Sequence, residues 1–311
     1  MESAILFGNG LNRAAGNKMS WEDLLKKLSS VRDLPSDSNT LNYECIYLDL
    51  CKGERKYEKG SAVEIEYDLK CTIAKACSSF HAGEIYEKLA QLPVHVYLTT
   101  NYDGVLDRTL EKMGYNFDKD ASCMTETLYS IRRCHAYQKT LIEPSKRIFP
   151  IHGEYAAPKS IMIGYDHYCG SLGKLDDFFK GNYAYQQNEQ VIKLPKLTTR
   201  LKDEEKRLDM GMYWPDYFFT HNIHIIGLSL QLVETDLWWV LNKRSRIMHF
   251  TDSIRNEIYF YGDPDKQTTK LLETFGVNVV RVPTKEPKGQ AEWDEAYRIM
   301  MAEMQKRIEM H

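Results

Sequence analysis

The sequence predicts an α/β fold in which a doubly wound parallel sheet carries helical insertions. Short apolar runs of strand length recur along the 311 residues, and helical patterns separate most of them. Several runs end at a glycine or a polar turn, as buried parallel strands do when they lead into a helix. Strands that alternate with helices favour a parallel sheet whose crossover helices cover both faces.

The first strand is predicted at residues 3–7, a continuous apolar run that ends at Gly8. A helix follows the glycine turn, because Ser20 and Asp23 form a capping-box pattern before leucines at helical spacing. Residues 35–92 begin with a polar, proline- and serine-containing stretch and continue as helical patterns without a strand. We expect this region to be a helical insertion.

A second unit of strand, loop and helix is predicted at residues 94–113, where a β-branched and aromatic run leads into Thr100-Asn101-Tyr102-Asp103-Gly104. Residues 165–220 are aromatic-rich and lack a clear period, so we expect an irregular insertion or lid over one end of the sheet. Four more strands are predicted, at residues 148–151, 223–226, 258–261 and 277–282.

Composition narrows the class of protein. Hydrophobic residues make up 43% of the chain, which suffices for the core of a large α/β domain. The formal net charge of −3 gives too weak a field to hold a phosphate polymer, so no direct binding to nucleic acid is expected. No basic leader precedes the first strand and no apolar run approaches membrane-spanning length, so we expect a cytoplasmic protein without membrane contact.

The seven cysteines are an odd number, widely scattered and without a Cys-x-x-Cys pair, which fits reduced thiols better than a disulfide framework. Two regular pairs occur, Cys45 with Cys51 and Cys71 with Cys77. Residues at that spacing point to different sides of a helix, so we expect no metal site.

The ends of the predicted strands are polar and marked by glycine. They should converge in space, because the ligand crevice of an open parallel sheet lies beyond the carboxyl ends of its strands. Gly8 and Gly10 would let backbone N–H groups approach a pyrophosphate. Arg13 stands where the dinucleotide fingerprint of dehydrogenases has its third glycine, so hydride transfer is disfavoured. The four strand ends read Gly8-Asn9-Gly10-Leu11-Asn12-Arg13, Thr100-Asn101-Tyr102-Asp103, His152-Gly153 and Gly227-Leu228-Ser229.

This ordered set of motifs, Gly-x-Gly, Thr-x-Asn-x-Asp, His-Gly and Gly-x-Ser, resembles the sirtuin superfamily. The chain is more similar to the sirtuin-like proteins of bacterial antiphage defence, and the likeness implies a single catalytic domain over residues 1–311. It implies a Rossmann-type sheet, NAD as ligand and substrate, and depletion of NAD as a form of abortive infection. The likeness rests on residues 6–13, 20–21, 99–103, 151–153, 160–164 and 236–239.

Asn101 and His152 are the candidate catalytic residues. The amide of Asn101 offers an oxygen and two N–H donors to a ribose or an ordered water without ionising, and His152 can accept a proton near neutral pH. The resemblance implies that Asp103 orients the nicotinamide carboxamide. The other candidate NAD-binding residues lie in the same turns and after a later strand: Gly8, Asn9, Gly10, Asn12, Arg13, Gly227, Ser229 and Asp263.

Each motif alone has a simpler interpretation, since an Asn-x-Asp after a strand is commonly a capping turn and both His-Gly and Asp263 fit plain turns. Protein deacylases of the superfamily carry a four-cysteine zinc module, for which this chain has no paired cysteines, so water is the expected acceptor. Two alternatives stay open: a non-catalytic sensor of NAD or ADP-ribose, and a transferase that moves ADP-ribose or an acyl group.

Trp238 and Trp239 lie in a helical pattern whose apolar surface is broader than one core-facing stripe. Deep burial is one explanation of the pair. A homo-oligomer interface is the other, since aromatic residues are enriched at such contacts. We expect a homo-oligomer, and the resemblance adds a partner protein of the defence system.

Overall fold

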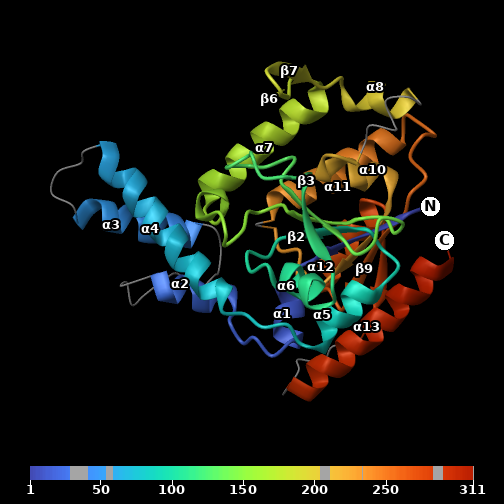
Figure 1. The fold of residues 1–311 in the computed structure, drawn as a ribbon, viewed down its shortest axis with the longest axis horizontal. Coiled ribbons are helices and arrows are strands. Elements are labelled where there is room, and N and C mark those ends of the chain that lie inside the picture. Colours follow the sequence, from blue (N-terminus) through green and yellow to red (C-terminus); the bar gives the residue numbers. More distant parts are fainter. Residues whose placement is uncertain (29–40, 54–58, 204–210, 233, 283–289, 311) are drawn as a thin grey trace.

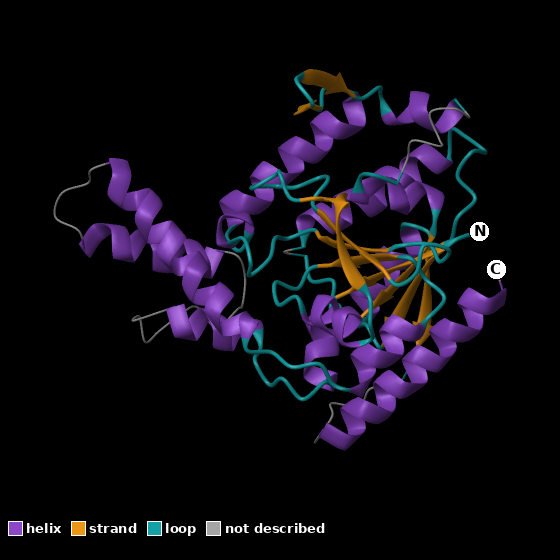
Figure 2. Ribbon diagram, in the orientation of Figure 1, coloured by secondary structure: helices purple, strands orange, loops and turns teal. Residues whose placement is uncertain are grey.

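The computed structural model describes residues 1–28, 41–53, 59–203, 211–232, 234–282 and 290–310. At its centre is an eight-stranded, mostly parallel sheet with helices on both faces, which confirms the predicted fold class (Figures 1 and 2). The strands lie in the order β10-β9-β8-β1-β2-β5-β4-β3. Their bounds are β1 (Ser3–Phe7), β2 (Val96–Thr99), β3 (Asn116–Cys123), β4 (Cys134–Gln138), β5 (Lys146–Pro150), β8 (Asn222–Ile226), β9 (Ile258–Gly262) and β10 (Val277–Arg281).

Strand β1 lies inside the sheet and pairs in parallel with β2 on one side and β8 on the other. The chain first builds the sheet toward β2 and β5 and later returns to add β8, so the order of strands switches direction at β1. The register places the last residues of four strands side by side, as Ile226, Phe7, Thr99 and Pro150. The turns that follow these strands therefore meet beyond the carboxyl ends of the strands, as the sequence predicts.

One edge of the sheet holds two strands that the hydrophobic pattern did not predict. Strand β4 runs antiparallel to β5, and β3 runs antiparallel to β4. Because β3 is polar and largely exposed, it shows neither an apolar run nor a regular alternation. Its strand conformation depends on pairing with β4, which is a tertiary contact.

Residues 165–203 and 211–220 are more regular than expected, and residues 204–210 of the predicted insertion lie outside the described residues. They contain helix α7 (Tyr165–Lys180), a hairpin of β6 (Ala184–Gln187) and β7 (Gln190–Lys193), and the short helices α8 (Leu197–Lys202) and α10 (Tyr217–Thr220). Helix α7 buries aromatic side chains against several neighbours, and this breadth hides its period in the sequence. The expectation of an irregular segment is corrected accordingly.

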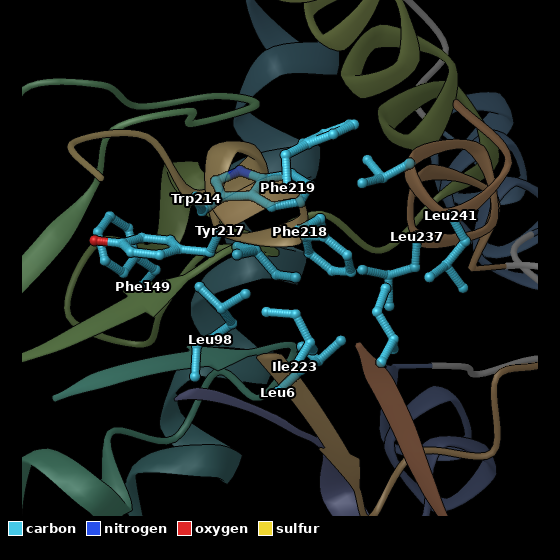
Figure 3. Close-up of a cluster of buried hydrophobic side chains, with 14 of the residues drawn as sticks. Leu6, Leu98, Phe149, Trp214, Tyr217, Phe218, Phe219, Ile223, Leu237 and Leu241 are labelled. Atoms are coloured by element: carbon cyan, nitrogen blue, oxygen red, sulfur yellow. The ribbon is translucent and has the colours of Figure 1, made fainter. Parts of the chain in front are cut away.

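Two helical layers cover the sheet. Helices α10, α11 (Thr235–Met248) and α12 (Lys266–Thr274) lie over one face, with α7 packed against α11. Figure 3 shows the apolar core on this face, where Leu6 and Ile223 of the sheet meet Phe218 of α10. The other face is covered by α1 (Asn9–Ala14), α5 (Glu84–Gln91), α6 (Val105–Lys112) and α13 (Gln290–Met310).

Helices α2 (Trp21–Leu28), α3 (Leu41–Gly53) and α4 (Lys59–Ser78) extend away from the sheet, at the left of Figure 1, around a separate apolar cluster. The predicted capping box begins α2, since Asp23 N donates to Ser20 Oγ (3.1 Å) and Ser20 N to Asp23 Oδ2 (3.0 Å). Tyr102 belongs to this cluster, so the helical arm packs beside the predicted site. Of the expected insertion, residues 35–40 and 54–58 lie outside the described residues, and α5 belongs to the sheet layers.

The two adjacent tryptophans of α11 pack within the chain. Trp238 is buried and donates its Nε1–H to Gln231 O (3.1 Å). Trp239 is half-buried against Phe179, with 5.2 Å between the ring centroids. Burial therefore accounts for Trp238, and the homo-oligomer stays a prediction.

All seven cysteines are unpaired. Within the described ranges, no group of three His, Cys, Asp or Glu side chains is placed to hold a metal ion. The same residues include no helix that is both long and apolar enough to cross a membrane.

Candidate active site

The turns after β1 and β8 are joined through their backbones. Gly8 N donates to Ile226 O (3.2 Å), and Gly10 N donates to Gly227 O (2.8 Å). A Cβ on Gly10 would lie 2.8 Å from Gly227 Cα, so this contact requires a glycine. In this conformation Gly8 and Gly10 serve close packing, and their role in binding a pyrophosphate stays a prediction.

A chain of hydrogen bonds joins α1 to the turn after β2. Asn12 Nδ2 donates to Asp103 Oδ2 (2.6 Å), and Asn12 Oδ1 accepts from the Tyr86 hydroxyl (2.6 Å). The second oxygen of Asp103 accepts from Val105 N (2.8 Å), and burial raises the pKa of this carboxyl. Asn12 and Asp103 thus meet as predicted. Tyr86 of α5 is an addition that no motif singled out.

Asn101 lies between these turns and is 8% exposed. Its backbone N–H donates to Thr99 Oγ1 (3.0 Å). The side-chain Nδ2 is buried close to the Tyr86 hydroxyl but outside hydrogen-bonding geometry, and it has no partner among the described residues. A buried amide donor without a partner costs stability, so Nδ2 is available to a water or a ligand beside it.

His152 is buried at the end of β5 and is paired with an aspartate. Its Nε2 lies 2.8 Å from Asp236 Oδ2 at the start of α11, and the other oxygen of Asp236 accepts from Leu237 N (2.9 Å). An ionised carboxylate can only accept, so Nε2 carries the proton and Nδ1 is the acceptor of the neutral ring. Burial acts to lower the pKa of His152, but the carboxylates of Asp236 and Glu234 outweigh it and raise the pKa.

Glu234 is a second carboxyl group near His152. Its Oε2 is buried without a hydrogen-bond partner in the described structure, although the residue as a whole is half-buried. Burial, with a contribution from Asp236, raises the pKa of Glu234 to about 7. Sequence reasoning missed both carboxyl groups. The only indication in the sequence was that Asp236 belongs to residues 236–239, which contribute to the family resemblance.

Four predicted ligand residues lie at the margin of this arrangement. Asn9 donates to Met19 O (3.1 Å) and accepts from Asn12 (3.1 Å). The guanidinium of Arg13 stacks on Trp293, with 4.6 Å from Cζ to the ring centroid. Ser229 is exposed. Asp263 follows β9, and its Oδ1 lies 3.0 Å from Arg281 Nη1. Their contacts with NAD, like that of Gly227, stay predictions.

The space beside Asn101 is small. Asn101, Asp103, His135 and Glu154 are among the residues that line a cavity of about 10 Å³, which is the size of one water molecule. The Tyr168 ring of α7 stands edge-on to His152, with 5.3 Å between the centroids. Neither His152 nor Gly8 and Gly10 line this cavity, so its size describes only the space beside Asn101 and Asp103.

No family model matches the chain. It resembles NAD(+) hydrolases. The protein named NAD(+) hydrolase ThsA of Bacillus cereus (strain MSX-D12) is 23% identical over 178 residues, which are 57% of this chain and 33% of the relative. The protein of the same name from Acinetobacter baumannii (strain 532279) is 26% identical over 167 residues, 53% of this chain and 30% of the relative. The match thus spans about a third of the length of each relative.

Proposed function

We propose that the chain is an NAD glycohydrolase that cleaves the nicotinamide–ribose bond of NAD and depletes the cofactor during antiphage defence. The observation that carries this proposal is the buried Asn101 Nδ2, a donor without a partner in the described residues, at the strand ends where His152 and Asp236 form a buried pair. The relatives named NAD(+) hydrolases support the same substrate. Because the match spans only about a third of each relative, the reaction is part of this proposal. The defence partner, the cytoplasmic location and the homo-oligomeric state are proposals as well.

The chemistry suits these groups. Nicotinamide in NAD is a cationic leaving group, so cleavage needs little acid catalysis and depends on holding the ribose and stabilising an oxocarbenium-like transition state. Asn101 Nδ2 would donate to a ribose oxygen or to the attacking water. His152 Nδ1 would accept a proton from that water or from a ribose hydroxyl, with Asp236 fixing the ring through Nε2.

Contact between substrate and His152 would require access to the imidazole ring. Tyr168 of α7 stands edge-on to that ring, with 5.3 Å between the centroids. A shift at the start of α7, within the predicted lid of residues 165–220, would uncover this side of His152.

The test is nicotinamide release from NAD by the purified chain, measured with and without a protein acceptor, alongside calorimetric binding of NAD. Release without an acceptor supports a glycohydrolase. Release only with an acceptor identifies a transferase, and binding without release identifies a sensor. Either of the last two outcomes overturns the proposal.

A further inference from the structure

His135 of β4 contacts two carboxylates that come from different parts of the chain. Its Nδ1 lies 2.6 Å from Asp107 Oδ1, and its Nε2 lies 2.8 Å from Glu154 Oε2. Asp107 stands in the first turn of α6, four positions after Asp103. Glu154 comes two positions after His152. A single imidazole ring therefore bridges the segment that carries Asn101 and the segment that carries His152.

The bridge works in one protonation state. Burial acts to lower the pKa of His135, but the carboxylates of Asp107 and Glu154 outweigh it and raise the pKa to about 10. The ring is therefore an imidazolium at neutral pH, and its charge attracts both carboxylates. Nδ1 hydrogen-bonds to Asp107, whereas the contact of Nε2 with Glu154 is an ion pair without hydrogen-bond geometry.

Two further side chains contact the two carboxylates, and one of them, Arg133, is a cation. Arg133 Nη1 donates to Glu154 Oε1 (2.6 Å), and the Tyr137 hydroxyl donates to Asp107 Oδ1 (3.1 Å). Two cations thus meet two carboxylates, and the side chains of Arg133 and Glu154 are only 3% and 4% exposed. Buried ion pairs contribute little net stability compared with apolar packing, but they fix geometry.

The bridge also borders the site directly. Asn101, Asp107, His135 and Glu154 all line the one-water cavity of about 10 Å³. A shift of the His135 ring would therefore change the walls of the space beside the Asn101 side chain. The strand pairing of β4 with β5 holds the sheet edge independently, through the His135–Ile148 and Tyr137–Lys146 register.

We propose that His135 is a positioning residue, which holds the segments of residues 101–107 and 151–154 at the spacing that NAD cleavage requires. The proposal rests on the proposed function. Asp107 and Glu154 act with His135 as its two anchors. The ring touches neither substrate nor reacting atoms, and its effect passes through Asn101 and His152.

The experiment compares His135→Gln and Glu154→Gln with Asp216→Asn. The control removes one charge from another buried pair, Arg200 with Asp216, which precedes β8 and lies away from the strand ends. We expect kcat to fall about 10- to 100-fold in both test variants with KM little changed, because small misplacements of catalytic groups have effects of that order. The control should lower thermal stability without changing kcat per folded molecule.

Hydrogen exchange gives a second result that does not depend on NAD. Residues 101–107 and 151–154 should exchange faster in both test variants than in the wild type and the control. Unchanged exchange in these segments, or wild-type kcat in folded His135→Gln, overturns the positioning role. If His135→Gln does not fold, the same two measurements on the isosteric variant Glu154→Gln test the positioning role. If the wild-type protein does not cleave NAD, the proposed function is wrong. The hydrogen-exchange result then still shows whether His135 holds the two segments together.

Discussion

Asn101 and His152 are both buried, but their surroundings differ. The side-chain Nδ2 of Asn101 has no partner among the described residues, whereas His152 Nε2 donates to the carboxylate of a fully buried Asp236. Both residues follow strands in polar turns, where a substitution ordinarily has little effect on the fold. His152 is an exception, because removing one member of a buried pair typically costs about 3–5 kcal/mol. Loss of activity in a His152 variant must therefore be separated from loss of folded protein.

Asn101→Ala provides the cleaner test of the site. We expect nicotinamide release to fall at least about 100-fold, as when one transition-state donor is removed. The melting temperature should stay constant or rise, because the variant deletes a buried amide whose Nδ2 makes no hydrogen bond in the described structure. Turnover and a thermal melt measure the two effects. A marked fall in melting temperature with normal turnover would assign Asn101 to a capping turn instead.

The pH dependence of cleavage tests the role of Asp236. If His152 Nδ1 is the base, kcat/KM rises with pH as the ring loses its proton, around a pKa raised above 6.5 by Asp236 and Glu234. In Asp236→Asn this rise should move to lower pH, because the larger of the two raising charges is gone. The plateau should also fall, since an amide N–H can donate to Nε2 and reverse the tautomer. Asp216→Asn is the matched control, and a profile for Asp236→Asn that coincides with it contradicts the assignment.

At the scale of secondary structure, the parallel strands were predictable because most are buried on both faces and all contain a run of apolar residues. Strand β3 and helix α7 were not, since β3 is polar and depends on its partner while α7 packs on several sides. The same division holds for the site. Asn101 and His152 follow predictable strands, but His135 lies on the unpredicted β4, and its partners come from distant positions. Such pairs are visible only once the chain is folded.

The turn after β1 packs against the turn after β8, and this contact gives a prediction for Gly10. A Cβ at this position would lie 2.0 Å from the Tyr297 hydroxyl and 2.8 Å from Gly227 Cα. Gly10→Ala should therefore force apart the turns after β1 and β8, with a loss of about 1–3 kcal/mol, typical of overpacking, and reduced NAD cleavage. Chemical denaturation and turnover measure both. Gly173→Ala is the control: nothing lies within 4 Å of its added Cβ, and alanine favours a helix by about 1 kcal/mol.

The whole molecule combines an assembled set of candidate catalytic groups with a His152 ring that Tyr168 covers on one side. An enzyme that destroyed NAD continuously would deplete the cell that makes it, so a closed resting state fits the proposed function. Because Trp238 is buried and Trp239 packs on Phe179, replacing them would disturb the core and could not isolate an interface. Phe250 is the better probe, since it is 86% exposed just after α11.

We therefore predict that the isolated chain binds NAD but cleaves it slowly until it is assembled or triggered. Opening of the site is then a shift between two populations, and whatever binds the open form increases activity. The measurement is specific activity over a wide range of protein concentration, with light scattering to follow assembly, for the wild type and Phe250→Ser. Activity that rises with concentration, and rises less in Phe250→Ser, indicates assembly through this surface. A slow rate at every concentration points to a partner or small ligand as the trigger, whereas rapid turnover by a dilute monomer rules out a silent resting state.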